Sequence, residues 1–259
     1  PPETWEAFRE MSMVATDRDT ETYGYALAVN ASSVANWLWS RGGDLLSPDG
    51  KTAVFNGPEA VEALTFVQAL VDGAHAYLVA ERQGGQTDFA DQKVLFTFDS
   101  TERLPQYAQA IVDGATGEPR FNWSVASTPH STAEPVVLIY GPGVCVLKTT
   151  PQKQLASWLF IRWFVQPENN VKWATVANHF PVRQAVLDSE EMQAYVGENP
   201  NYGTAFAFLQ WGRAEPPVSA YDTIRGLINE ATTAFITGQS TLQEALDFAV
   251  QEANALLAE

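Results

Sequence analysis

The sequence predicts an α/β fold in which helices dominate the second half of the chain. Two short apolar segments in the first half, Tyr23–Val29 and residues 93–98 (KVLFTF), are typical of buried strands. From Pro151 onward the chain is mostly helical, and prolines at first turns and glycines at ends mark the elements. No period repeats along the sequence. Such a mixture of strands and helices indicates the α/β class.

A helix over residues 4–16 is expected to open the chain. Thr4 can cap its N-terminus, because a threonine hydroxyl accepts a hydrogen bond from a first-turn N–H group. Trp5, Phe8 and Met11 follow at helical spacing and share one face, which predicts that this face is buried.

The first predicted strand is followed by a second helix. Ser32 or Ser33 can cap it, and Gly42-Gly43 ends it. Residues 44–56 then have the pattern of a short β-hairpin, in which Pro48-Asp49-Gly50 supplies the turn.

The most strongly amphipathic helix of the first half begins at Pro58 and ends at Gly73. Val61, Leu64 and Val67 recur on one stripe, as expected for a helix that packs against a core. Proline at the first helical position and glycine just after the end follow the usual asymmetry of helix termini.

Later elements are marked by the same signals. A helix is expected over residues 101–112, a strand-like segment over 121–126, a polar linker over 127–135 and an apolar run over Val136–Leu147. The helices expected after that run cover residues 151–165, 168–177, 188–196, 203–210, 218–237 and 241–258.

The composition is that of a globular protein with an acidic surface. Hydrophobic residues make up 46% of the 259 residues, and 31 Asp and Glu outnumber 15 Lys and Arg to give a net charge of −16. Such a surface repels phosphate backbones and anionic membranes, so nucleic acid is not an expected partner. The plainer interpretation is that the acidity keeps the protein soluble.

The single cysteine, Cys145, lies in the apolar run Gly-Val-Cys-Val-Leu and is expected to be a small core residue. No apolar stretch approaches the ~20 residues of a membrane span. The opening residues Pro1-Pro2-Glu3-Thr4-Trp5 do not have the pattern of a signal peptide; a mature, truncated or proteolysed chain would begin in this way.

Motifs for catalysis and for cofactors are absent from the sequence. The three histidines are far apart, and no zinc-binding spacing, serine-nucleophile elbow, dinucleotide loop or nucleotide-phosphate loop is present. We therefore expect no metal, no cofactor and no enzymatic activity. Carboxylate pairs such as Glu190-Glu191, Asp88 with Asp91 and Asp99 with Glu102 leave a glycosidase-type enzyme as the alternative.

Five segments in fixed order resemble the family of extracellular solute-binding proteins that includes the maltose- and glycerol-3-phosphate-binding proteins. They are PPETWEAF (1–8), FNGPEAVEALTFVQALVDG (55–73), FADQKVLFTFDST (89–101), residues 140–183 ending in FPVR, and FITGQSTLQEALDFAVQEANALLAE (235–259). The stretch 140–183 is the most specific. The resemblance implies two α/β lobes that close on a ligand like a clamp, the periplasmic-binding-protein-like type II fold.

The resemblance also implies how the chain divides. Residues 1–126 and 165–259 would form the C-terminal lobe, and residues 127–164 would cross to the N-terminal lobe. Family members carry an additional segment before the one like PPETW, so a separate chain could supply it. The function implied is capture of a sugar, polyol or glycerophosphate for the permease subunits of an ABC importer. The location implied is periplasmic or extracellular, with a lipid anchor if the source is Gram-positive.

Some candidate ligand-binding residues follow from positions that match polar residues of the glycerol-3-phosphate binders. Asn30 follows a strand and matches a polar cleft residue, but it can equally be a helix cap. Ser100 and Thr101 match a pair of serines at a helix start, where capping is again the alternative. Tyr140 and Gly141 match a Gly-Gly loop, in which Tyr replaces one glycine. Because of this departure from the family pattern, the identity of the ligand stays open.

Other candidates are larger side chains. His179 lies where those binders place a tyrosine, and a surface histidine is the alternative. Arg213 matches a phosphate-holding arginine, and its planar fork suits phosphate; a surface salt bridge is the alternative. Trp211 could stack on a sugar, as could Trp37 or Trp39, although helical spacing indicates that one of the latter two is in the core.

Overall fold

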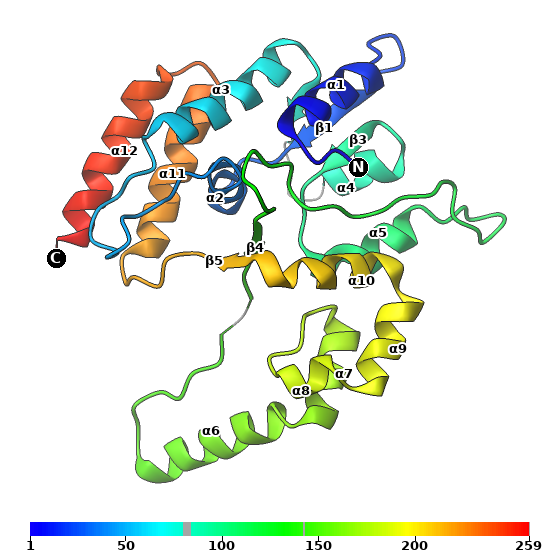
Figure 1. Cartoon of the computed structure of the whole chain (residues 1–259), viewed down its shortest axis with the longest axis vertical. Coiled ribbons are helices and arrows are strands. Elements are labelled where there is room, and N and C mark those ends of the chain that lie inside the picture. The colour runs from blue at the N-terminus through cyan, green and yellow to red at the C-terminus, as the bar shows by residue number, and fades with distance from the viewer. Residues whose placement is uncertain (80–83, 142, 259) are drawn as a thin grey trace. The chain divides into compact units, whose positions relative to one another are not determined.

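The computed structural model describes residues 1–79, 84–141 and 143–258 of the chain (Figure 1). Contacts divide the chain into two compact units, and each unit is made of non-contiguous segments. Unit 1 comprises Pro1–Phe98, Ala126–Ile139 and Gln210–Glu259, and unit 2 comprises Asp99–Val125 and Tyr140–Leu209. The chain therefore passes from one unit to the other four times.

The lobes that the family resemblance implies stay a prediction, and the contact-based units group the residues differently. Residues 99–125 and 165–209 were expected in the same lobe as the rest of 1–126 and 165–259, but they group with residues 140–164 instead. Residues 99–125 join residues 165–209 through a separate small core, because Leu104 packs against the buried cluster of Ala174, Met192 and Tyr202. The predicted segment 127–164 is also divided, because its first part belongs to unit 1.

Unit 1 contains a parallel three-stranded sheet of order β2-β1-β3. The strands are β1 (Tyr23–Leu27), β2 (Ala76–Leu78) and β3 (Val94–Thr97), and Tyr25 of the central strand lies beside Ala76 on one side and Phe96 on the other. A second, two-stranded parallel sheet joins β4 (Val137–Ile139) to β5 (Gly212–Ala214). The predicted first strand and the strand at residues 93–98 are confirmed; β2 and β5 were not predicted, since three-residue strands have almost no sequence signal.

Helices make up most of the rest of unit 1. They are α1 (Trp5–Ala15), α2 (Ala31–Trp39), α3 (Pro58–Asp72), α4 (Gly84–Ala90), α11 (Tyr221–Ile236) and α12 (Leu242–Leu257). Thr4 caps α1 as predicted, because its hydroxyl oxygen accepts from the Ala7 N–H group at 3.2 Å. The cap of α2 was predicted wrongly as Ser32 or Ser33. Asn30 caps it, and its Oδ1 accepts from the Ser33 N–H group at 2.9 Å.

The core of unit 1 joins the N-terminal half to the last two helices. Leu27, Trp37, Leu64 and Ile224 are among its most buried members, and α11 and α12 pack together and against α2 and α3. Gly24 allows β1 to lie directly against α1, since a Cβ at this position would be 2.3 Å from the Ser12 Cα. The central strand and α1 can therefore pack this closely only because Gly24 has no side chain.

Unit 2 is helical. It contains η1 (Thr101–Arg103), α5 (Leu104–Ala110), α6 (Pro151–Phe164), α7 (Pro167–Ala177), α8 (Gln184–Leu187), α9 (Glu190–Glu198) and α10 (Pro200–Ala207), and η2 (Phe208–Trp211) leads back into unit 1. Its buried core consists of Ala174, Met192 and Tyr202. Helix α6 contributes no buried residue to that core.

Two local predictions were wrong, and a third was confirmed only in part. Residues 121–126 form no strand, and no described strand lies alongside them to pair with their backbone. Cys145 is exposed rather than in a core, because residues 143–150 run along the surface. The predicted hairpin at residues 44–56 is reduced to one antiparallel bridge, between Leu46 and Ala53.

The buried Tyr25 predicts a loss of stability at alkaline pH. Burial raises the pKa of Tyr25 well above its usual value, and its hydroxyl finds no hydrogen-bond partner among the described residues. Above about pH 10 the unfolded state loses this proton while the folded state keeps it, so the free energy of unfolding falls as pH rises. Urea unfolding between about pH 8 and about pH 11 measures this slope.

The control for this prediction is a pair of tyrosine-to-phenylalanine variants. Tyr25→Phe removes the hydroxyl that the folded state cannot ionise and should flatten the alkaline slope. Tyr140→Phe, at a 59% exposed residue, should leave the slope as in the wild type. Equal slopes in all three proteins would contradict the prediction.

Candidate ligand-binding site

The candidate residues divide between the two units. Asn30, Trp37, Trp211 and Arg213 belong to unit 1, and the other five belong to unit 2. In unit 1, the chain leaves the carboxyl end of β1 and reaches Asn30 at the start of α2. Ligands of open α/β sheets bind at the carboxyl ends of the strands, so the N-terminal end of α2 is a candidate position for a ligand.

Asn30 serves as a helix cap, the alternative that its sequence position left open. Its side-chain oxygen is used by the Ser33 N–H group, and its Nδ2 donates to the Ala28 carbonyl at 3.4 Å. The side chain is half-buried. A contact between Asn30 and a ligand remains a prediction, and it would have to coexist with the cap.

A network that the sequence did not predict lies beside the first turn of α2. Arg225 on α11 donates from Nη1 to both carboxylate oxygens of Glu215, and from Nη2 to Ser32 Oγ at 3.0 Å. Ser32 Oγ in turn donates to Glu215 at 3.3 Å. Ser32 and Arg225 are 193 residues apart in sequence, so no local pattern could have revealed their contact.

Arg213 on β5 is held in a second ion pair. Its Nη2 lies 2.5 Å from Asp44 Oδ2, and its guanidinium carbon lies 4.5 Å from the centre of the Trp39 ring. The pair is partly open to solvent, with side chains 40% and 41% exposed. The salt bridge that sequence reasoning kept as an alternative is therefore present. We refer to Ser32, Asp44, Arg213, Glu215 and Arg225 together as the α2–β5 polar cluster.

The tryptophans near this cluster differ in their burial. Trp37 and Trp39 are both 1% exposed and belong to the core. The burial of Trp37 argues against its predicted contact with the ligand, and it is buried because core residues surround nearly the whole circumference of α2. Trp211 is half-buried and directly precedes β5, so it remains a candidate for stacking on a ligand.

Unit 2 brings two of the predicted segments together. Ser100 and Thr101 lie at the start of η1, and the Ser100 side chain makes no capping hydrogen bond. The next residue, Glu102, places a carboxylate oxygen 3.8 Å from His179 Nε2. The His179 ring stacks on Trp173 with centroids 5.3 Å apart and planes 17° apart.

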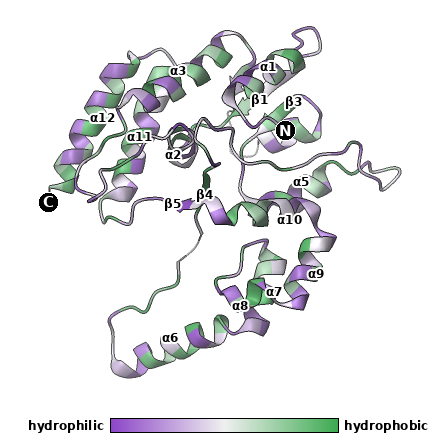
Figure 2. Cartoon of the chain, in the orientation of Figure 1, coloured by the Kyte–Doolittle hydropathy of each residue, from purple (hydrophilic) through white to green (hydrophobic). Residues whose placement is uncertain are grey.

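Tyr140 and Gly141 are exposed at the start of a long surface segment. Their predicted loop continues through Pro142, which lies outside the described residues. Helix α6, which follows, has large apolar side chains exposed to solvent; they are Leu155, Trp158, Leu159, Phe160 and Trp163. Figure 2 shows hydrophobic and hydrophilic residues interspersed along the ribbon of α6. Nothing described in unit 2 covers this face of α6.

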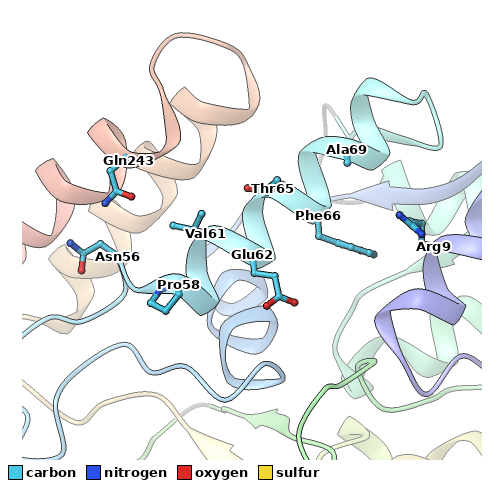
Figure 3. Close-up of a pocket in the computed structure, with 9 residues that line it drawn as sticks. All are labelled: Arg9, Asn56, Pro58, Val61, Glu62, Thr65, Phe66, Ala69 and Gln243. Atoms are coloured by element: carbon cyan, nitrogen blue, oxygen red, sulfur yellow. The ribbon is translucent and has the colours of Figure 1, made fainter.

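A groove lies along α3, and none of the predicted ligand-binding residues lines it (Figure 3). It has a volume of about 760 Å³ and is open to solvent. Its walls come from α1, α3 and α12 and from the loop before α3, and they are Arg9, Asn56, Pro58, Val61, Glu62, Thr65, Phe66, Ala69 and Gln243. Its lining is mostly apolar and offers few groups that would orient a polar ligand.

Two of the carboxylates that left a glycosidase-type enzyme as an alternative accept hydrogen bonds from tyrosines. Asp88 accepts a hydrogen bond from the Tyr77 hydroxyl, and Asp99 accepts from the Tyr107 hydroxyl at 3.1 Å. Within residues 1–79, 84–141 and 143–258, no group of histidine, cysteine or acidic side chains could hold a metal ion. No helix in those same ranges is long and apolar enough to cross a membrane.

Comparisons with known proteins agree on one family and one fold. A family model described as bacterial extracellular solute-binding protein matches residues 1–201. The periplasmic sn-glycerol-3-phosphate-binding protein UgpB of Escherichia coli K12 is 23% identical over 224 residues, 81% of this chain and 49% of that protein. The chain thus spans about half the length of the curated relatives it matches.

Two solved structures show the likeness of fold. A solute-binding protein of an ABC transporter from Thermotoga lettingae, bound with α-D-tagatose, has a TM-score of 0.80 at 22% identity, over 99% of this chain and 65% of that one. UgpB of Mycobacterium tuberculosis, in complex with glycerophosphocholine, has a TM-score of 0.73 at 16% identity, over 100% of this chain and 64% of that one. The predicted fold class, a periplasmic-binding-protein-like α/β fold, is confirmed.

Proposed function

Because the chain belongs to the bacterial extracellular solute-binding protein family, we propose that it is the ligand-capturing component of an ABC importer. The ligand is a sugar, a polyol or a glycerophosphate compound, and it is bound without chemistry. The family match over residues 1–201 carries this proposal. The ligands of the two similar structures, a sugar and a glycerophosphodiester, support the range of ligand chemistry.

The proposal includes two kinds of polypeptide partner. Permease subunits of the importer would receive the ligand. The polypeptide that corresponds to the remainder of the relatives would cover α6, whose exposed leucines and tryptophans support this part of the proposal. The place of action is the periplasm or the cell surface, with a lipid anchor in a Gram-positive source.

A thermal-shift screen of the 259-residue chain against sugars, polyols and glycerophosphates tests the proposal. A ligand that binds only the folded state raises the midpoint, and at a hundred times its Kd it adds about 2.7 kcal/mol to the free energy of unfolding. Circular dichroism confirms that the chain is folded. A folded chain that responds to no compound would contradict the proposal, and a product formed at a protein-dependent rate would favour an enzyme.

Trp211 provides a site-specific prediction. If its ring stacks on the ligand, Trp211→Ala should raise the Kd of the best ligand about tenfold. Trp163→Ala on α6, where the side chain is 52% exposed, is the control and should leave the Kd unchanged. Isothermal titration calorimetry measures both, and equal Kd values for the two variants would remove Trp211 from the site.

A further inference from the structure

Each arginine of the α2–β5 polar cluster is matched by a carboxylate. Arg213 is paired with Asp44 at 2.5 Å, and Arg225 is clasped by both oxygens of Glu215. Arg225 also donates a hydrogen bond from Nη2 to Ser32 Oγ. Each pair therefore contributes no net charge to this edge of unit 1.

The pairing bears directly on phosphate recognition. An arginine binds phosphate through two parallel N–H groups and through its positive charge. Asp44 weakens both contributions of Arg213 to phosphate binding. Its carboxylate accepts a hydrogen bond from Nη2, and its negative charge lies beside the guanidinium. A phosphate beside this pair would meet a repelling carboxylate as well as an attracting guanidinium.

The same arrangement suits a neutral polyhydroxy ligand. A hydroxyl group both donates and accepts hydrogen bonds, a carboxylate accepts only, and a guanidinium donates only. A salt bridge at a half-exposed edge thus presents acceptors and donors side by side, which is what neighbouring hydroxyls of a sugar or polyol require. The half-buried Trp211, next to β5, adds an apolar ring face.

Negative charge also opposes anion binding in unit 2 and over the chain as a whole. The candidate His179 faces the carboxylate of Glu102 at 3.8 Å. The net charge of −16 opposes the approach of anions to any part of the surface. The arginine that the glycerol-3-phosphate relatives suggested as a phosphate ligand is thus neutralised within this chain.

We infer that the ligand of this protein is an uncharged sugar or polyol, and that Asp44 and Glu215 exclude phosphorylated compounds by neutralising Arg213 and Arg225. This inference rests on the proposed function and narrows it to one of the ligand classes that the relatives bind.

The test uses matched pairs of compounds and one charge-removing variant. Thermal shift and calorimetry compare glycerol with glycerol 3-phosphate, glucose with glucose 6-phosphate, and inorganic phosphate alone. The wild type should respond to no phosphate-containing probe more strongly than to its neutral counterpart. Asp44→Asn keeps the shape of the side chain and frees Arg213, so it should bind inorganic phosphate about tenfold more tightly than the wild type does.

Three further variants show whether a gain in phosphate binding comes from the freed arginine. Asp72→Asn removes the same charge at the exposed end of α3 and should leave phosphate binding unchanged. Asp44→Asn combined with Arg213→Gln should lose the gain, which assigns it to Arg213. Glu215→Gln repeats the experiment at Arg225, and circular dichroism shows which variants are folded.

The outcomes separate this inference from the proposed function. A wild type that binds a phosphorylated compound more tightly than its neutral partner overturns the inference and leaves the proposed function standing. A folded Asp44→Asn variant with no gain for phosphate also overturns it. If no neutral compound binds, the proposed function fails, whatever the variants do with phosphate.

Discussion

Trp37→Ala is expected to lower the free energy of unfolding of unit 1 by about 3–5 kcal/mol, the cost usual for truncating a large buried aromatic side chain. The Trp37 ring is 1% exposed and is among the largest fully buried side chains. It lies in the core that joins α2 to the sheet and to the last two helices. Removing it loses apolar burial and leaves a cavity that the close-packed surroundings can only partly fill.

Urea unfolding followed by circular dichroism measures this loss. Trp158→Ala on α6 is the matched control, because that ring is 55% exposed and its removal should change stability by no more than about 0.5 kcal/mol. A Trp37→Ala variant as stable as the control would contradict the burial of Trp37. It would also restore this ring as a candidate for contact with the ligand.

Gly24→Ala is expected to destabilise unit 1 by about 1–3 kcal/mol or more. The added Cβ would lie 2.3 Å from the Ser12 Cα and 2.6 Å from the Ser12 carbonyl oxygen, so the obstacle is the backbone of α1 and not a flexible side chain. Either α1 or the central strand must move, and Phe8 on α1 packs against Tyr25 on that strand. The disturbance therefore extends into the core.

Gly226→Ala gives the opposite result and serves as the control. Gly226 lies inside α11, and a Cβ there would meet no atom within 4 Å. Alanine in a helix interior is favoured over glycine by about 0.5–1 kcal/mol, so this variant should be more stable than the wild type. If both variants shift the urea midpoint in the same direction, the close approach at Gly24 is not what decides its effect.

Most helices could be predicted from sequence because their signals are local. Thr4, Pro58 and Gly73 mark helix ends through their own backbone preferences, and each lies at such an end in the structure. The failures concern pairing over long distances. Residues 121–126 have the composition of a strand, but a strand exists only where a partner strand lies beside it.

The candidate site could be predicted only in part. The position of Arg213 was read from a resemblance, but its partner Asp44 is 169 residues away and has no signal of its own. Glu215 and Ser32 were not predicted for the same reason. Trp37 and Trp39 differ by two positions on one helix, and both proved buried, because nearly the whole circumference of α2 is surrounded by core residues.

The division of unit 1 into three segments has a consequence for how the protein is made. A ribosome delivers residues 1–98 before residues 210–259, so the surfaces of α2 and α3 that α11 and α12 later cover are at first open to water. All of unit 2 must then be synthesised before those two helices emerge. During that interval the nascent chain exposes core surface of α2 and α3, so its yield in a cell should depend on how well chaperones protect the early segment until α11 and α12 have emerged.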